Sequence, residues 1–257
     1  MATGPVPPAP SSRSPRRAGP ASVRAAAQVF VEDLEALEPA EEDLHHLARV
    51  LRLRPGEPVV AADGAGSWRL GVFRAAGAPL EAAGPLSTEV RADPPVVVGF
   101  VPVKGDRPEW TVQKLTEVGV DRIVVLRSAR AVVRWQGERA GPALERLRRV
   151  AREAAAQSRR AFLPEVEGIF DPVGLAGVLS PVALALAEPG APPPTRETTA
   201  VAVGPEGGWD PAELAAVPGH VGLGPGILRA ETAALGAGIL LCALRDGLAE
   251  PPGGGPG

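Results

Sequence analysis

The feature that most constrains the fold is the uninterrupted apolar run "PPVVVGFVPV" at residues 94–103. Side chains of a strand alternate between two faces, so a strand with one face in water would show a polar residue at every second position. This run has none, which predicts a strand buried on both faces. Such strands are typical of parallel sheets covered by helices on each side.

Strand-like and helix-like segments alternate after this run. We expect strands at 121–128, 182–188, 199–204 and 220–224, and helices at 107–119, 137–160, 210–217 and 231–248. Strands that alternate with helices indicate a parallel sheet in an α/β domain. We therefore expect this domain to span residues 93–249.

The preceding part of the chain has a different character. Between about 26 and 92, short β-like runs are separated by turn signals, with one helix expected at 39–52. This pattern indicates a small, mostly β domain over 23–92. The flanking segments 1–22 and 250–257 are rich in Pro, Gly, Ala, Ser and Arg, and we expect them to be disordered.

Composition excludes several classes of protein. The net charge of −3 over 257 residues does not indicate nucleic-acid binding, which must then depend on local clusters. The only cysteine, Cys242, excludes disulfides within the chain and lies in an apolar run expected to be core. His45, His46 and His220 lack metal-ligand spacing, so we expect no metal. With no apolar stretch of about 20 residues and no secretory signal, we expect a cytoplasmic protein without membrane contact.

Two glycine-bearing loops lie close together near the C-terminus, "VGPEGGWDPAEL" at 203–214 and "LGPGILRAETAAL" at 223–235. In the first, Asp210 followed by Pro211 and Glu213 predicts a capping box at a helix start. That explains the sequence from Asp210 onward, but not the glycines that precede it. Glycines at such a position allow a ligand to approach the backbone closely.

The usual phosphate-binding loops do not fit this region. A P-loop needs Gly-Lys-Ser/Thr, and both lysines of the chain, Lys104 and Lys114, lie far upstream. The Gly-x-Gly-x-Gly of 222–226 leaves only 31 residues after it, too few for the strands of a dinucleotide-binding domain. A metabolic enzyme that uses a nucleotide is therefore disfavoured.

The two loops together resemble those of the SPOUT-class methyltransferases that methylate N3 of a uridine in 16S ribosomal RNA, the RsmE family. The segments 45–64, 104–120 and 151–166 are similar to further signatures of that family, and the resemblance covers about 26–248 in order. It implies an α/β fold with an N-terminal PUA-like β-barrel domain, then a SPOUT domain with a parallel sheet and a C-terminal trefoil knot. It also implies a homodimer.

The resemblance further implies S-adenosylmethionine as the cofactor, which needs no lysine because it carries no phosphate. The expected cofactor-binding residues are in the two loops: Gly204, Glu206, Gly207, Gly208, Leu223, Gly224 and Leu228. Glu206 is expected to face the ribose or the sulfonium, with a turn cap as the alternative. Because N3 of uridine must lose a proton, the reaction needs a base or a group that stabilises the anion. Arg229 is expected to stabilise charge on the uracil oxygens. Glu231 is expected to act as base or to orient Arg229, with a plain ion pair at the helix start as the alternative.

The implied partner is 16S ribosomal RNA in an assembled or nearly assembled small ribosomal subunit. Residues 122–160 hold eleven Arg against three Glu, a local charge of +8. The expected RNA contacts are Arg49, Arg52, Lys104, Arg130, Arg134, Arg159 and Arg160. Gly226 and Ala230 stand where the family usually has Arg and often has Thr. Two alternatives stay open: a SPOUT enzyme with another RNA target, and a non-catalytic RNA-binding relative.

Overall fold

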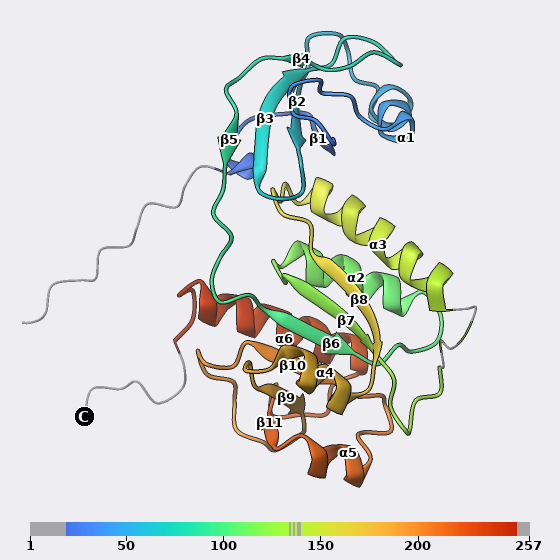
Figure 1. Cartoon of the computed structure of the whole chain (residues 1–257), viewed down its shortest axis with the longest axis vertical. Helices are drawn as coiled ribbons and strands as arrows, with labels where there is room; N and C mark the ends of the chain where they lie inside the picture. The colour runs from blue at the N-terminus through green and yellow to red at the C-terminus, as the bar shows by residue number, and fades with distance from the viewer. Residues whose placement is uncertain (1–18, 134, 136, 138–139, 251–257) are drawn as a thin grey trace, which may run out of the picture.

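Two β-sheets divide the chain into an N-terminal and a C-terminal domain (Figure 1). The computed structural model describes residues 19–250 except 134, 136, 138 and 139. The N-terminal sheet holds β1 (Ala27–Phe30), β2 (Pro58–Ala62), β3 (Ser67–Val72), β4 (Glu81–Ala82) and β5 (Ser87–Thr88). The C-terminal sheet holds β6 (Val97–Phe100), β7 (Arg122–Leu126), β8 (Glu165–Phe170), β9 (Leu184–Ala187), β10 (Ala200–Val203) and β11 (Gly219–Val221).

In the N-terminal sheet β1 pairs parallel with β2, and the remaining pairs are antiparallel. Among the described residues the strand pairs run from β1 through β2 and β3 to β4, with β5 also pairing with β3, and none of these pairs closes the sheet into the β-barrel that was expected. The expected helix at 39–52 is shorter and divided, with α1 (Glu41–His45) continuing into η2 (His46–Val50), a π-helical turn. The predicted domain boundary near 93 falls between β5 and β6.

All strand pairs of the C-terminal sheet are parallel, in the order β11-β9-β10-β6-β7-β8. Helices α2 (Arg107–Glu117), α3 (Ala140–Gln157) and α6 (Ala230–Arg245) cover one face, and α4 (Pro172–Leu179) and α5 (Pro211–Ala216) cover the other. In β6, Val98 and Phe100 pack on the first face, whereas Val97 packs on the second. The prediction of a strand buried on both faces is therefore confirmed.

Sequence patterns failed to predict β8 and α4. β8 lies at the edge of the sheet, is only half-buried, and contains Gly168, so it lacks the apolar content of a central strand. α4 reads "PVGLAGVL" and has no polar residue to mark an exposed face. Its start is nevertheless well defined, because the Asp171 side chain accepts a hydrogen bond from the Gly174 N–H at 2.8 Å.

The predicted disordered tails lie largely outside the described residues. Pro20–Ser22, which the prediction places in the first tail, form a single 3-10 turn, η1, and Pro20 is buried. No described helix has the length and apolarity that a membrane crossing requires.

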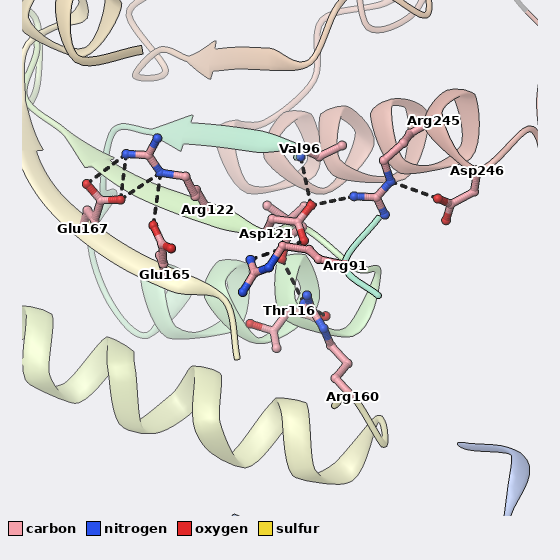
Figure 2. Close-up of polar contacts among 11 residues, drawn as sticks. Arg91, Val96, Thr116, Asp121, Arg122, Arg160, Glu165, Glu167, Arg245 and Asp246 are labelled. Carbon is pink, nitrogen blue, oxygen red and sulfur yellow. Dashed lines mark hydrogen bonds and ion pairs between the residues drawn. The ribbon is translucent and has the colours of Figure 1, made fainter. Parts of the chain in front are cut away.

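The amino-terminal edge of the parallel sheet is organised by a buried carboxylate, Asp121 (Figure 2). It accepts hydrogen bonds from the Val96 N–H at 2.9 Å and from Arg245 Nη1 at 2.6 Å, and Arg91 Nη1 lies 3.9 Å away. The side chains of Asp121 and Arg245 are only 6% and 8% exposed. The group thus joins the starts of β6 and β7 to the end of α6 and to the segment between the two domains.

We predict that Asp121→Ala lowers the free energy of unfolding by about 3–5 kcal/mol, because it leaves the Arg245 guanidinium buried without its main partner. Urea unfolding followed by circular dichroism measures this. The control is Glu145→Ala, which removes an ion pair with Arg148 whose side chains are 65% and 49% exposed. That variant should lose less than about 1 kcal/mol. Equal losses in the two variants would contradict the role given to Asp121.

Candidate active site

A cavity of about 310 Å³ lies at the carboxyl ends of β9, β10 and β11. Three segments line it, and all seven residues predicted to bind the cofactor are among them. The lining is Ala187, Glu188, Pro189, Val203, Gly204, Pro205, Glu206, Gly207, Gly208, Trp209, Leu223, Gly224, Gly226, Ile227, Leu228, Ala230 and Ala233. The residues after β9 were not predicted, because nothing in "ALALAEPG" distinguishes a ligand-binding strand end from any other.

The first glycine loop is shaped by Trp209, whose ring is buried and whose Nε1 donates a hydrogen bond to the Ala187 carbonyl at 3.2 Å. Gly204 lies against this ring: a Cβ built there would be 2.9 Å from Trp209 Cε2. Gly208 has a φ of +71°, a conformation that side chains other than glycine rarely adopt. The conformation and packing of the loop therefore require glycine at both positions. The two glycines also leave the backbone of the loop open to the cavity.

The predicted capping box at the end of this loop is confirmed. The Asp210 side chain accepts from the Ala212 N–H, and Glu213 accepts from the Asp210 N–H at 2.8 Å. Glu213 also accepts from Ser128 Oγ and from the Ala129 N–H, both at 3.0 Å. One carboxylate thus fixes the cavity loop to the segment that follows β7.

Arg130, predicted to bind RNA, lies against the same loop. Its Nη1 donates to the Gly207 carbonyl at 3.2 Å, and its Nε is 3.7 Å from Asp210 Oδ2. The side chain is 46% exposed, so it supports the loop while one side stays open to solvent. Its contact with RNA stays a prediction.

The second glycine loop leads into α6. Arg229 occupies the N-cap position of α6, and its side chain is exposed. Ile227, at the rim of the cavity, is 91% exposed. The N-terminus of a helix carries partial positive charge, and Arg229 adds a full charge at the same point. This end of α6 is therefore suited to an anion that forms beside the cavity.

Glu231 does not pair with Arg229 among the described contacts; it lies 3.6 Å from Arg107 Nε, measured from its Oε1. Nη1 of the same arginine is 3.3 Å from Glu206 Oε1 in the first loop. The other carboxylate oxygen of Glu231, Oε2, is buried without a hydrogen-bond partner in the described structure. Sequence reasoning missed Arg107, although a cation in the first turn of a helix is an unfavourable placement that marks it for attention.

The other predicted RNA-binding residues fall into two groups. Arg49, Arg52 and Lys104 are exposed. Arg159 donates to the Ala25 and Ala27 carbonyls, and Arg160 donates to the Thr116 and Val120 carbonyls, so both guanidinium groups are used within the protein. Burial lowers the pKa of Arg160. These hydrogen bonds favour a structural role for Arg159 and Arg160 over the predicted RNA contact. Arg134, the remaining predicted RNA contact, lies outside the described residues.

Burial raises the pKa of the Cys242 thiol to about 11, as expected for a core cysteine. Within the described ranges, no three His, Cys, Asp or Glu side chains are grouped so as to hold a metal ion.

Comparison with known proteins defines the class. A model of the RNA methyltransferase domain matches residues 91–241, and a model of the RNA methyltransferase PUA domain matches residues 39–78. The parallel sheet with its carboxyl-edge cavity is thus an RNA methyltransferase domain, preceded by a PUA-like domain. Ribosomal RNA small subunit methyltransferase E of Mycobacterium tuberculosis is 38% identical over 212 residues, covering 74% of this chain and 79% of that protein.

Two further relatives agree. The Bacillus subtilis protein of the same name is 27% identical over 231 residues, covering 80% of this chain and 89% of that one. The crystal structure of the Neisseria gonorrhoeae protein of that name, bound to S-adenosyl methionine, has a TM-score of 0.72 and 26% identity, covering 85% of this chain and 97% of that chain. The chain belongs to the ribosomal RNA small subunit methyltransferase E family.

We predict that Gly204→Ala lowers the free energy of unfolding by about 1–3 kcal/mol, because the new methyl group overlaps the packed Trp209 ring. The matched control is Gly224→Ala in the second loop, where an added Cβ meets nothing within 4 Å. Its stability should equal that of the wild type. Thermal unfolding of the three proteins measures the difference, and a wild-type midpoint for Gly204→Ala would show that the loop does not depend on this packing.

Proposed function

We propose that this protein transfers the methyl group of S-adenosylmethionine to N3 of a uridine in the 16S ribosomal RNA of the small ribosomal subunit. As a member of its family it is an RNA methyltransferase that uses S-adenosylmethionine. One observation carries the proposal: the cavity is lined by glycines and two carboxylates, and Arg229 lies beside it at the start of α6.

The lining of the cavity fits S-adenosylmethionine. It contains two carboxylates, Glu188 and Glu206, and no lysine or arginine. Such a site disfavours phosphate and favours a cation, which agrees with the sulfonium of this cofactor. The glycines of both loops present backbone N–H and C=O groups that suit adenine and ribose, and the apolar residues limit access of water. When bound, S-adenosylmethionine supplies a methyl group already activated for transfer.

The chain's own residues must orient the uridine and manage the proton of N3. We assign Arg229 to the uracil oxygens, where its charge and the N-terminus of α6 stabilise the anion that forms as the proton leaves. We assign the proton to Glu231, whose Oε2 has no hydrogen-bond partner among the described residues and which lies in the first turn of the same helix. A uridine in folded RNA must leave its stack to reach this point.

The wider assembly follows from the same proposal. Arg49 and Arg52 on the N-terminal domain and the exposed Lys104 between β6 and α2 are the proposed phosphate contacts, and Arg130 combines loop support with an RNA contact. We further propose for the C-terminal domain the trefoil knot that its resemblance to the SPOUT methyltransferases implies. A second copy of the chain, forming a homodimer, would cover the exposed Ile227 at the rim. The place of action is the cytoplasm, where small subunits assemble.

The test is methyl transfer from labelled S-adenosylmethionine to small ribosomal subunits that lack the modification, with the nucleoside identified by mass spectrometry. One 3-methyluridine per subunit is expected, with slower transfer to naked RNA fragments. Transfer to another nucleoside would indicate a different RNA target. Cofactor binding without any transfer would also overturn the proposed substrate, and absence of cofactor binding would indicate a non-catalytic relative.

We predict that Arg229→Ala lowers the rate of methyl transfer about 10²- to 10³-fold, the usual effect of removing one group that stabilises a developing oxyanion. The affinity for S-adenosylmethionine should be retained, because Arg229 does not line the cavity. Single-turnover transfer and equilibrium binding of the cofactor separate the two effects. Arg74→Ala, which removes an exposed arginine of the N-terminal domain, is the control and should leave both unchanged. A parallel loss of cofactor affinity in Arg229→Ala would argue against the assignment.

A further inference from the structure

We propose that Arg107 is a positioning residue that ties the cofactor loop to the start of α6 and moderates the negative charge at the cofactor cavity. The inference rests on the proposed function, since it concerns the same cavity. It goes beyond that function by assigning Arg107 a part in the discrimination between S-adenosylmethionine and its spent product, S-adenosylhomocysteine.

Arg107 joins three segments that are distant in sequence. It lies at the start of α2, its Nη1 is 3.3 Å from Glu206 Oε1 in the β10–α5 loop, and its Nε is 3.6 Å from Glu231 Oε1 in α6. The Glu231 side chain is 16% exposed and that of Glu206 is 62% exposed. The link to α6 is therefore the protected one, and the link to the loop is the one that solvent or ligand reaches.

The stability of α2 does not explain an arginine at this place. Arg107 is the first residue of the helix, where the macrodipole favours anions and disfavours a cation. The exposed pair with Glu206 contributes little to folding, as exposed ion pairs generally do. What Arg107 does achieve is geometric: one rigid guanidinium contacts both the lining of the cavity and the helix start that we assign to catalysis.

The charges explain the second part of the proposal. Glu188 and Glu206 line the cavity, and its described lining includes no cationic side chain. Arg107 is the cation that pairs with the Glu206 carboxylate, whereas Arg130 contacts the backbone of the same loop at Gly207. S-adenosylmethionine carries a sulfonium charge that S-adenosylhomocysteine lacks. By neutralising Glu206, Arg107 weakens the attraction for the charged donor relative to the uncharged product. Removing Arg107 should therefore raise the preference for the donor, even while a looser loop weakens the binding of both ligands.

The experiment is calorimetric titration of the full chain with S-adenosylmethionine and with S-adenosylhomocysteine. For Arg107→Met, the ratio of Kd for the product to Kd for the donor should rise roughly three- to tenfold, as expected for one charge at intermediate dielectric. Glu206→Gln should shift this ratio in the opposite direction by a similar factor. Arg107→Lys keeps the charge and should keep the wild-type ratio, although methyl transfer should slow because an ammonium does not hold both carboxylates in a fixed fork.

Arg74→Met removes the same charge from the N-terminal domain and should leave the ratio unchanged. If Arg107 were only structural, both ligands would lose affinity equally and the ratio would stay constant in Arg107→Met and Glu206→Gln, which would overturn the inference. Should Arg107→Met fail to fold, Arg107→Gln removes the same charge with a polar side chain and should show the same rise in the ratio, and a constant ratio in that variant would overturn the inference. Failure of the wild type to bind S-adenosylmethionine would instead refute the proposed function, so the two failures are distinguishable.

Discussion

The buried Asp121 carboxylate is the interaction on which the arrangement of the C-terminal domain depends. It accepts from the Val96 N–H at the start of β6 and from Arg245 at the end of α6 (Figure 2). A carboxylate removed from water must be compensated by partners in fixed positions, so its neighbours have little freedom. Because these contacts hold the amino-terminal edge of the sheet, the opposite edge is left to loops whose shape serves a ligand.

At that opposite edge the first loop is held by the buried Trp209 ring, which packs in the core on the α4 and α5 face, and by polar contacts and glycines. Glu213 accepts from the Asp210 N–H, from Ser128 Oγ and from the Ala129 N–H, and Arg130 donates to the Gly207 carbonyl. The same carboxylate that caps the start of α5 thus fixes the position of the cavity loop. A capping box is a local hydrogen-bond arrangement, but this one also fixes the loop that lines the cavity.

Local patterns predicted most of the strands and helices of the C-terminal domain, and the resemblance to the family predicted seven of the residues that line the cavity. The apolar run around Val98 correctly predicted a strand buried on both faces. The glycines at 204 and 208 indicated a loop that requires a close approach of its backbone to a side chain and a positive φ. Patterns failed where the signal is not local. β8 lacks the continuous apolar run of a buried strand, and α4 lacks the polar face of a surface helix. The structural role of Arg160 depends on hydrogen bonds to carbonyls that are 40 and 44 residues away in the chain. The pairing of Arg107 with two distant glutamates is likewise visible only after folding.

The distribution of charge resolves the apparent conflict between a net charge of −3 and an RNA substrate. The cofactor is cationic and the RNA is anionic, so one protein must present both signs of charge within a short distance. Here the carboxylates Glu188 and Glu206 line the cavity, whereas exposed arginines and Lys104 lie outside it. Arg107 and Arg229 stand where these two regions meet. Since charges in water are screened within about 10 Å, such local separation matters more to binding than the total does.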